Sequence, residues 1–138
     1  MTTPVFIDTS ALYAALDASD GHHARAAAGW NLLLDALADG SAVAVTHGSV
    51  LVEATALVQH RLGMGAVRDL QDRLVSLIDV EWVDRNRHDR ALTALLAAGR
   101  RTVSLVDWTS FELMRELAID VAFSFDENFE QQGFRAWH

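Results

Sequence analysis

The 138-residue sequence predicts an α/β fold, a three-layer α/β/α sandwich with a central parallel sheet of about five strands. Short β-type apolar runs alternate along the chain with longer segments of helical periodicity. Alternation of this kind favours right-handed crossovers, a parallel sheet and helices on both of its faces. The length suits one domain and 51% of the residues are hydrophobic, so we treat residues 1–138 as a single domain.

The strands are expected in five short runs, each bounded by helix-like segments. No internal repeat, low-complexity tract or linker interrupts this order. The runs are Val5–Ile7, Val43–Thr46, Val80–Val83, Val103–Val106 and Val121–Phe125.

Helical faces are predicted by placing residues at 100° intervals. Between positions 22 and 38 the core face consists of His23, Ala26, Ala27, Trp30, Leu33, Leu34 and Leu37. Between positions 84 and 98 it consists of His88, Ala91, Leu92, Leu95 and Leu96. Gly99 is a plausible stop for this second helix. Two further helices are expected in GSVLVEATALVQHRLG and WTSFELMREL.

Charge and composition restrict the chemistry. The net charge is -8, Cys is absent and all eleven basic residues are Arg. Disulfides and thiolate metal sites are therefore excluded, and phosphoryl-transfer sites that need a lysine are disfavoured. The start MTTPVFID has no signal-peptide pattern, and no apolar run is long enough to span a membrane. We expect a cytoplasmic protein.

Three of the expected strands end on an aspartate, namely Asp8, Asp107 and Asp126. Because parallel strands end on one edge of a sheet, these carboxylates should meet at the edge where α/β sheets bind ligands. Glu53 lies on the inward side of its helix by the same angular reckoning, whereas Glu112 and Glu116 lie on a solvated face. Taken singly, each aspartate could instead be a helix cap or turn residue.

Several carboxylates in one place require a counter-charge. Two of them about 4 Å apart repel by roughly 4 kcal/mol at an effective dielectric near 20. Oxygen-only ligands favour Mg²⁺ or Mn²⁺, as one or two ions. We expect Asp8 to be the bridging or central ligand, Asp107 and Asp126 to complete the first site, and Glu53 to serve a second site or orient water. Such cations would let a phosphate approach an acidic protein.

With these residues in these positions, the sequence resembles the PIN-domain ribonucleases, and among them the VapC-like toxins of bacterial toxin-antitoxin pairs. The similar blocks are VFIDTSALYAALDASDGHHARA, VLVEATALVQHRLG and SLVDWTSFELMRELAIDVAFSFDENFEQQGF. The resemblance implies a Mg²⁺- or Mn²⁺-dependent endoribonuclease whose catalytic and metal-binding quartet is Asp8, Glu53, Asp107 and Asp126. Thr9 matches the hydroxyl residue after the first aspartate and is implied to support the metal or the scissile phosphate.

The resemblance also implies partners. These are a second copy of the chain in a homodimer and a small cognate antitoxin whose basic C-terminal segment lies across the acidic groove. The substrate would be tRNA, rRNA or mRNA, and its cleavage would stop translation. The alternative from another class is a non-catalytic module whose acidic groove binds a basic peptide or RNA.

Several other residues have two interpretations. Trp108, where relatives carry a smaller residue, could stack on an RNA base or pack against another helix or protomer. His22 and His23 are expected to make hydrogen bonds at a helix start, and His88 to be a core residue. His47 and His60 are expected on the surface, with contact to the groove as the alternative. The arginine groups 85, 87, 90 and 100, 101 are expected on solvated faces, with RNA contact as the alternative.

Overall fold

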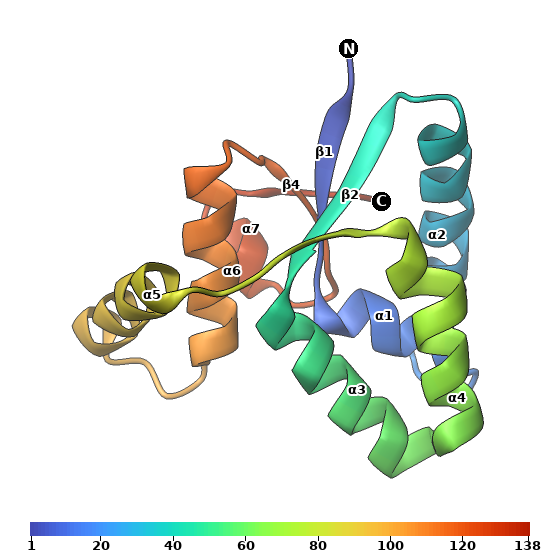
Figure 1. The fold of residues 1–138 in the computed structure, drawn as a ribbon, viewed down its shortest axis with the longest axis horizontal. Helices are drawn as coiled ribbons and strands as arrows, with labels where there is room; N and C mark the ends of the chain where they lie inside the picture. The colour runs from blue at the N-terminus through green and yellow to red at the C-terminus, as the bar shows by residue number, and fades with distance from the viewer.

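The computed structural model describes all 138 residues and has a five-stranded, wholly parallel sheet (Figure 1). The strand order is β3-β2-β1-β4-β5. The central strand β1 pairs with both β2 and β4, so that Val5 lies opposite Ala44 on one side and Val121 on the other. The strands are β1 Thr3–Ile7, β2 Ala42–His47, β3 Asp79–Glu81, β4 Val121–Phe123 and β5 Arg135–Ala136.

Helices cover both sides of the sheet, which confirms the predicted α/β architecture. Figure 1 shows α2 and α4 on one side of the strands and α5 and α6 on the other. No helix has both the length and the apolar character needed to cross a membrane. The helices are α1 Thr9–Leu16, α2 His23–Ala38, α3 Gly48–Leu62, α4 Met64–Asp69, α5 Arg85–Ala98, α6 Leu105–Glu116 and α7 Asn128–Gln131, with a π-turn η1 Leu70–Leu74 and a 3₁₀ turn η2 Val75–Leu77.

The predicted strand Val103–Val106 is wrong, because this segment starts helix α6. The Ser104 side chain accepts a hydrogen bond from the Asp107 backbone N–H at 3.1 Å. In return, Asp107 Oδ2 accepts one from the Ser104 backbone N–H at 2.9 Å. This reciprocal capping box stabilises a helix start, and here it outweighs the β tendency of the three apolar residues in this four-residue segment.

The fifth strand is instead β5, and no apolar run in the sequence predicts it. Arg135 and Ala136 are both exposed and pair with Val121 and Ala122 at the edge of the sheet. Two other expected strands are shorter than predicted. Strand β3 ends at Glu81 rather than at position 83, and β4 ends at Phe123 rather than at position 125. At both places the chain leaves the sheet as soon as the neighbouring strand no longer offers ladder partners.

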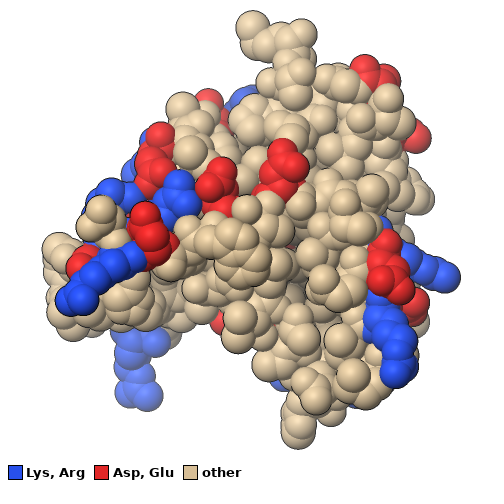
Figure 2. Space-filling view, viewed as in Figure 1, with Lys and Arg blue, Asp and Glu red and all other residues tan.

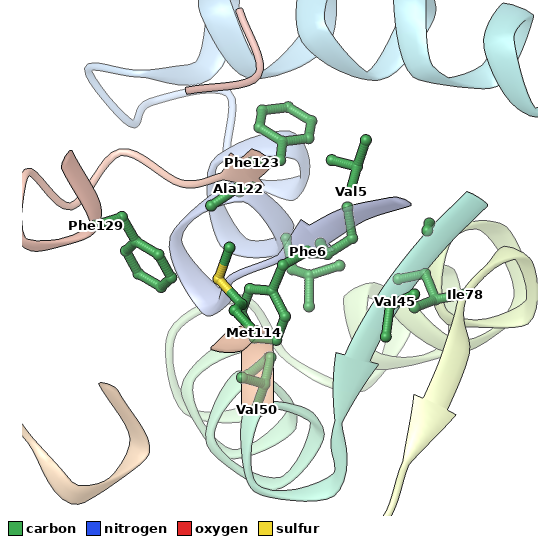
Figure 3. Packing of buried hydrophobic residues seen from close by; sticks show 14 of the residues in the cluster. Val5, Phe6, Val45, Val50, Ile78, Met114, Ala122, Phe123 and Phe129 are labelled. Carbon is green, nitrogen blue, oxygen red and sulfur yellow. The ribbon is translucent and has the colours of Figure 1, made fainter. Parts of the chain in front are cut away.

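The core fills the space on both faces of β1. Val5 and Phe6 point to opposite faces of the strand, as alternation along a strand requires (Figure 3). Phe6 lies near Met114 of α6 and Val50 of α3, whereas Phe123 occupies the Val5 side (Figure 3). All five of these side chains are fully buried. The sheet is therefore fixed against α3 and α6, and these two helices carry acidic residues to its edge.

Parts of the predicted helical faces are wrong. On α2, Ala26, Trp30 and Leu33 are buried as expected, but Ala27 and Leu34 are exposed. On α5, His88 is exposed rather than in the core, Leu92 and Leu95 are only partly buried, and Leu96 is 72% exposed. Each helix contacts the rest of the protein through a stripe narrower than its apolar face, because it is covered on one side only. The predicted stop at Gly99 is confirmed by its left-handed backbone, with φ of 65°.

Helix α2 and strand β4 approach each other closely at Gly29. A Cβ atom on Gly29 would lie 2.7 Å from Cζ of the buried Phe123 ring. Gly29→Ala should lower the free energy of unfolding by about 1–3 kcal/mol, although alanine favours helix, because the packed core must shift. Chemical denaturation measures this. Gly65→Ala in α4 is the matched control: nothing lies within 4 Å of its added methyl group, and its unfolding free energy should stay equal or rise. Equal effects at both positions would contradict the packing argument.

Candidate active site

Asp8 is the first residue after β1, and it caps the helix that follows. Its Oδ2 accepts a hydrogen bond from the Ser10 backbone N–H at 3.4 Å, at the N-terminus of α1. The side chain is 5% exposed. Capping explains why a buried strand ends on a carboxylate, because the helix start supplies donors and a favourable dipole. The cap and a role in the site are compatible interpretations of this residue.

Two serine hydroxyls hold the Asp8 carboxylate. Ser10 Oγ and Ser124 Oγ both donate to Asp8 Oδ2, at 2.8 and 2.9 Å. The same hydroxyls accept the backbone N–H groups of Phe125 and Asp126, at 2.9 and 3.0 Å. Each serine thus uses its single proton on Asp8 and ties the loop after β4 to the start of α1. All the Asp8 side-chain bonds end on Oδ2, which leaves Oδ1 without a protein donor.

The structure brings the four predicted acids to one pocket of about 270 Å³. They reach it from different elements: Asp8 from the end of β1, Glu53 from α3, Asp107 from the first turn of α6, and Asp126 from the loop after β4. Asp107 therefore arrives by a helix start and not by a strand end, which corrects the predicted route. The other residues that line the pocket are Thr9, Ser10, Tyr13, Asp20, His22 and Leu57.

Sequence reasoning missed three polar residues of the pocket and its supporting wall. Ser10 and Ser124 are missed because serine beside an aspartate is common in turns, although the pattern Ser-x-Asp at position 124 could have suggested a turn that orients Asp126. Asp20 adds a fifth carboxylate from the loop between α1 and α2.

Glu53, in contrast to the inward position predicted for it, is exposed and takes part in none of the six ion pairs of the protein.

The pocket disfavours negative charge as it stands. Burial raises the pKa of Asp8 to about 6, with the Asp107 carboxylate as a smaller contribution, although the hydrogen bonds from Ser10 and Ser124 oppose the rise. Burial also raises the pKa of Asp107, and the charges of Asp126 and Glu53 add to it. No Arg side chain lines the pocket. The missing counter-charge must therefore come from a bound group or from protons.

The donor set suits a hard divalent cation. Every carboxylate here is an oxygen ligand, and Thr9 Oγ1 is buried beside them without a hydrogen-bond partner. The side chains are not preorganised for metal coordination, because no three of the protein's acidic or imidazole groups are close enough together to hold an ion. The residues thus fit a Mg²⁺ or Mn²⁺ site in chemistry, and their side chains would have to draw together around the ion.

The histidines differ from their predicted roles. His47 is 1% exposed rather than on the surface, and its Nε2 donates to Ser110 Oγ at 2.9 Å, since that hydroxyl gives its own proton to Val106. The ring of His22 makes no helix-capping hydrogen bond but stacks on Phe125 at 4.7 Å and lines the pocket. His23 does make the expected kind of bond, with Nδ1 at 2.7 Å from the Ala14 carbonyl oxygen.

Trp108 is buried, which overturns the hypothesis that it stacks on RNA. The side chain is 8% exposed and meets Phe111 edge to face at 5.4 Å. Helix α6 is packed against neighbours on more than one side, including α5, so the face opposite the main core is also covered. The interpretation of Trp108 as a packing residue within the chain is therefore the correct one.

Comparison with known proteins identifies the family of this chain. Residues 5–135 match the PIN domain. The chain belongs to the PIN-domain family. Within that family it is 34% identical over 131 residues to the 23S rRNA-specific endonuclease VapC20 of Mycobacterium tuberculosis, and the alignment covers 94% of this chain and 95% of the relative.

Several solved structures have the same fold as this chain. The crystal structure of VapC20 from Mycobacterium tuberculosis, a sarcin-ricin loop cleaving toxin, superposes with a TM-score of 0.80 at 32% identity and covers 94% of this chain and 95% of that one. FitAcB from Neisseria gonorrhoeae and FitAB bound to IR36 DNA both give a TM-score of 0.67, at 12% and 14% identity. Each covers 97% of this chain and 96% of the other, and at these identities the likeness concerns the fold alone.

Proposed function

We propose that this PIN-domain protein is a metal-dependent endoribonuclease that acts as the toxin of a toxin-antitoxin pair and inhibits translation. The observation that carries the proposal is the pocket, into which four separate segments each bring a carboxylate, in a chain 34% identical to a 23S rRNA-specific endonuclease. Ribosomal RNA is accordingly the substrate class we favour. Such a substrate would place the working protein in the cytoplasm.

Asp8, Glu53, Asp107 and Asp126 are the residues we propose as cation ligands. A bound Mg²⁺ or Mn²⁺ supplies Lewis-acid activation of water and stabilises negative charge on the departing 3′ oxygen. Asp8 is the central ligand in this proposal, because its Oδ2 is fixed by two serines and its Oδ1 has no protein donor. We propose that Thr9 binds either a ligand water or the scissile phosphate, and the support for this role is its buried hydroxyl, which has no hydrogen-bond partner.

The acidic pocket also supports the proposed partner. A small antitoxin with a basic C-terminal segment could neutralise the same carboxylates that the cation neutralises, and would thereby compete with substrate. The similar protein VapC20 is a toxin that cleaves the sarcin-ricin loop, and a cell that makes such an enzyme needs an inhibitor of it. We further propose that the free toxin is a homodimer, as the family resemblance implies.

Cleavage of purified ribosomal RNA by antitoxin-free protein tests the proposed function. We expect cutting with Mg²⁺ or Mn²⁺, none with EDTA, and a loss of more than about 100-fold in rate for Glu53→Gln or Asp126→Asn, since even outer-shell partners of a metal cost 10–100-fold. Asp35→Asn, an exposed acid on α2 away from the pocket, is the matched control and should cut normally. Equal absence of cutting in every reaction would favour the non-catalytic binding module.

A further inference from the structure

The arginines of α5 do not supply free positive charge for RNA. Arg87 donates to Glu81 at 3.3 Å and to Glu116 at 2.7 Å, and Arg90 also pairs with Glu116. Arg85 lies 3.7 Å from Asp89. In Figure 2 the blue side chains over α5 lie among red ones. The cluster predicted at positions 85, 87 and 90 is therefore largely neutralised by its own neighbours.

Arg61 takes part in none of these ion pairs and lies over Tyr13, a residue that lines the acidic pocket. Its guanidinium carbon is 5.4 Å from the centre of the Tyr13 ring, which lines the pocket. Glu53 and Leu57 also line the pocket, and Arg61 follows them at the same spacing of four along α3. The three side chains thus continue along one face of the helix, from the carboxylates outward.

Arg25 has the same properties beside Phe125, outside the acidic pocket itself. It makes no ion pair, and its guanidinium carbon is 5.3 Å from the centre of the Phe125 ring. Phe125 is the residue between Ser124 and Asp126, and Arg25 lines a small cavity of about 110 Å³ together with both of them. His22 stacks on the same ring and lines the acidic pocket. Of the four proposed ligands, only Asp126 lines this cavity, together with Glu127 and Glu130, and Arg25 forms an ion pair with none of these three acids.

A guanidinium over an aromatic ring is partly oriented in advance and keeps its donors for another acceptor. In the proposed reaction a cation held by the carboxylates would bind the cleaved phosphate, and the neighbouring phosphates of the RNA strand would then pass beyond the pocket on either side. We propose that Arg25 and Arg61 bind the backbone phosphates that flank the cleaved one, and so guide a single strand of RNA across the acidic pocket. This inference rests on the proposed ribonuclease function.

The salt dependence of RNA binding tests the proposed phosphate contacts of Arg25 and Arg61. The probe is a fluorescently labelled RNA hairpin with the sequence of the sarcin-ricin loop of 23S rRNA, bound by protein carrying Asp8→Asn to prevent cleavage. Adding Arg25→Gln and Arg61→Gln should reduce the slope of log Kd against log salt concentration by about 0.7 for each phosphate of a single strand that the protein no longer neutralises, or about 1.4 for the pair. In protein with the native Asp8, the same pair should raise KM while kcat changes little.

The matched control removes two charges elsewhere. Arg100 and Arg101 are exposed, line none of the cavities and make no ion pair, so Arg100→Gln with Arg101→Gln should leave the slope unchanged. Circular dichroism of each variant verifies folding. An unchanged slope for the Arg25 and Arg61 pair, or an equal fall for the control pair, would overturn this inference while the protein still cuts RNA. Failure of the native protein both to bind and to cut RNA would overturn the proposed function as well.

Discussion

Asp8→Asn is expected to abolish RNA cleavage and, without divalent ions, to make the folded protein more stable at neutral pH. The pKa of Asp8 is about 6 in the folded protein and 3.8 as its ordinary value. A carboxyl group whose folded pKa is raised contributes stability below pH 3.8 and loses it as the pH rises through about 6. Above that range the buried charge costs about 3 kcal/mol, which the amide would remove.

Denaturation in EDTA at neutral pH measures this effect, together with cleavage assays in Mn²⁺. Function and stability are then opposed at one residue, as expected where a site is built to hold a cation rather than to support the fold. Adding Mn²⁺ should stabilise the native protein by mass action and have a much smaller effect on the variant. A variant that is less stable than the native protein in EDTA would contradict the electrostatic explanation.

His47→Gln is expected to change how stability depends on pH. The pKa of His47 falls from 6.5 to about 4 because the ring is buried, with the charge of Arg87 as a further cause. The neutral ring uses both nitrogens, since Nε2 bonds Ser110 and Nδ1 accepts the Val50 N–H at 3.3 Å. A group with a depressed folded pKa contributes stability above pH 6.5 and loses it as the pH falls through about 4. The loss amounts to roughly 3 kcal/mol.

The contributions of His47 and Asp8 have opposite signs over nearly the same range of pH. Between pH 6 and 4, acid should weaken the native fold through His47 and strengthen it through Asp8, so these two contributions should largely cancel in the native protein. His47→Gln should then gain stability relative to its own value at neutral pH, and Asp8→Asn should lose it. Unfolding free energies across this range measure both trends, with the exposed His60→Gln as control. Parallel curves for all these variants would refute the assignment.

Much of the fold follows from local pattern. Strands β1 and β2 and the helices α2, α3, α5 and α6 were all predicted near their observed positions, because a buried parallel strand and an amphipathic helix have different periods. Segment 103–106 was misassigned because its four residues resemble a strand, while the capping pair Ser104 and Asp107 gives a weaker signal. Strand β5 has no local signal, since its existence depends only on an open edge at β4.

The sequence predicts which acids form the candidate site, but not the residues that hold those acids in position. The four acids stand out from the sequence because carboxylates after apolar segments are conspicuous, and the structure gathers them in one pocket. The hydrogen bonds that hold Asp8 could not be predicted from the sequence. Ser10 and Ser124 meet at Asp8 only after folding brings together residues more than a hundred positions apart. The same limitation applies to Arg25 and Arg61, which cannot be separated by sequence from the arginines that make ion pairs.

Residue types and their spacing along the chain were enough to assign the α/β class, to exclude thiol and amine chemistry, and to select the acids that could act together. These features depend on periods of a few residues, which any short stretch displays. Only the folded arrangement revealed that Asp107 enters from a helix start, that His47 and Trp108 are buried, and which arginines form ion pairs. Burial and charge pairing arise between distant segments, so no local pattern encodes them.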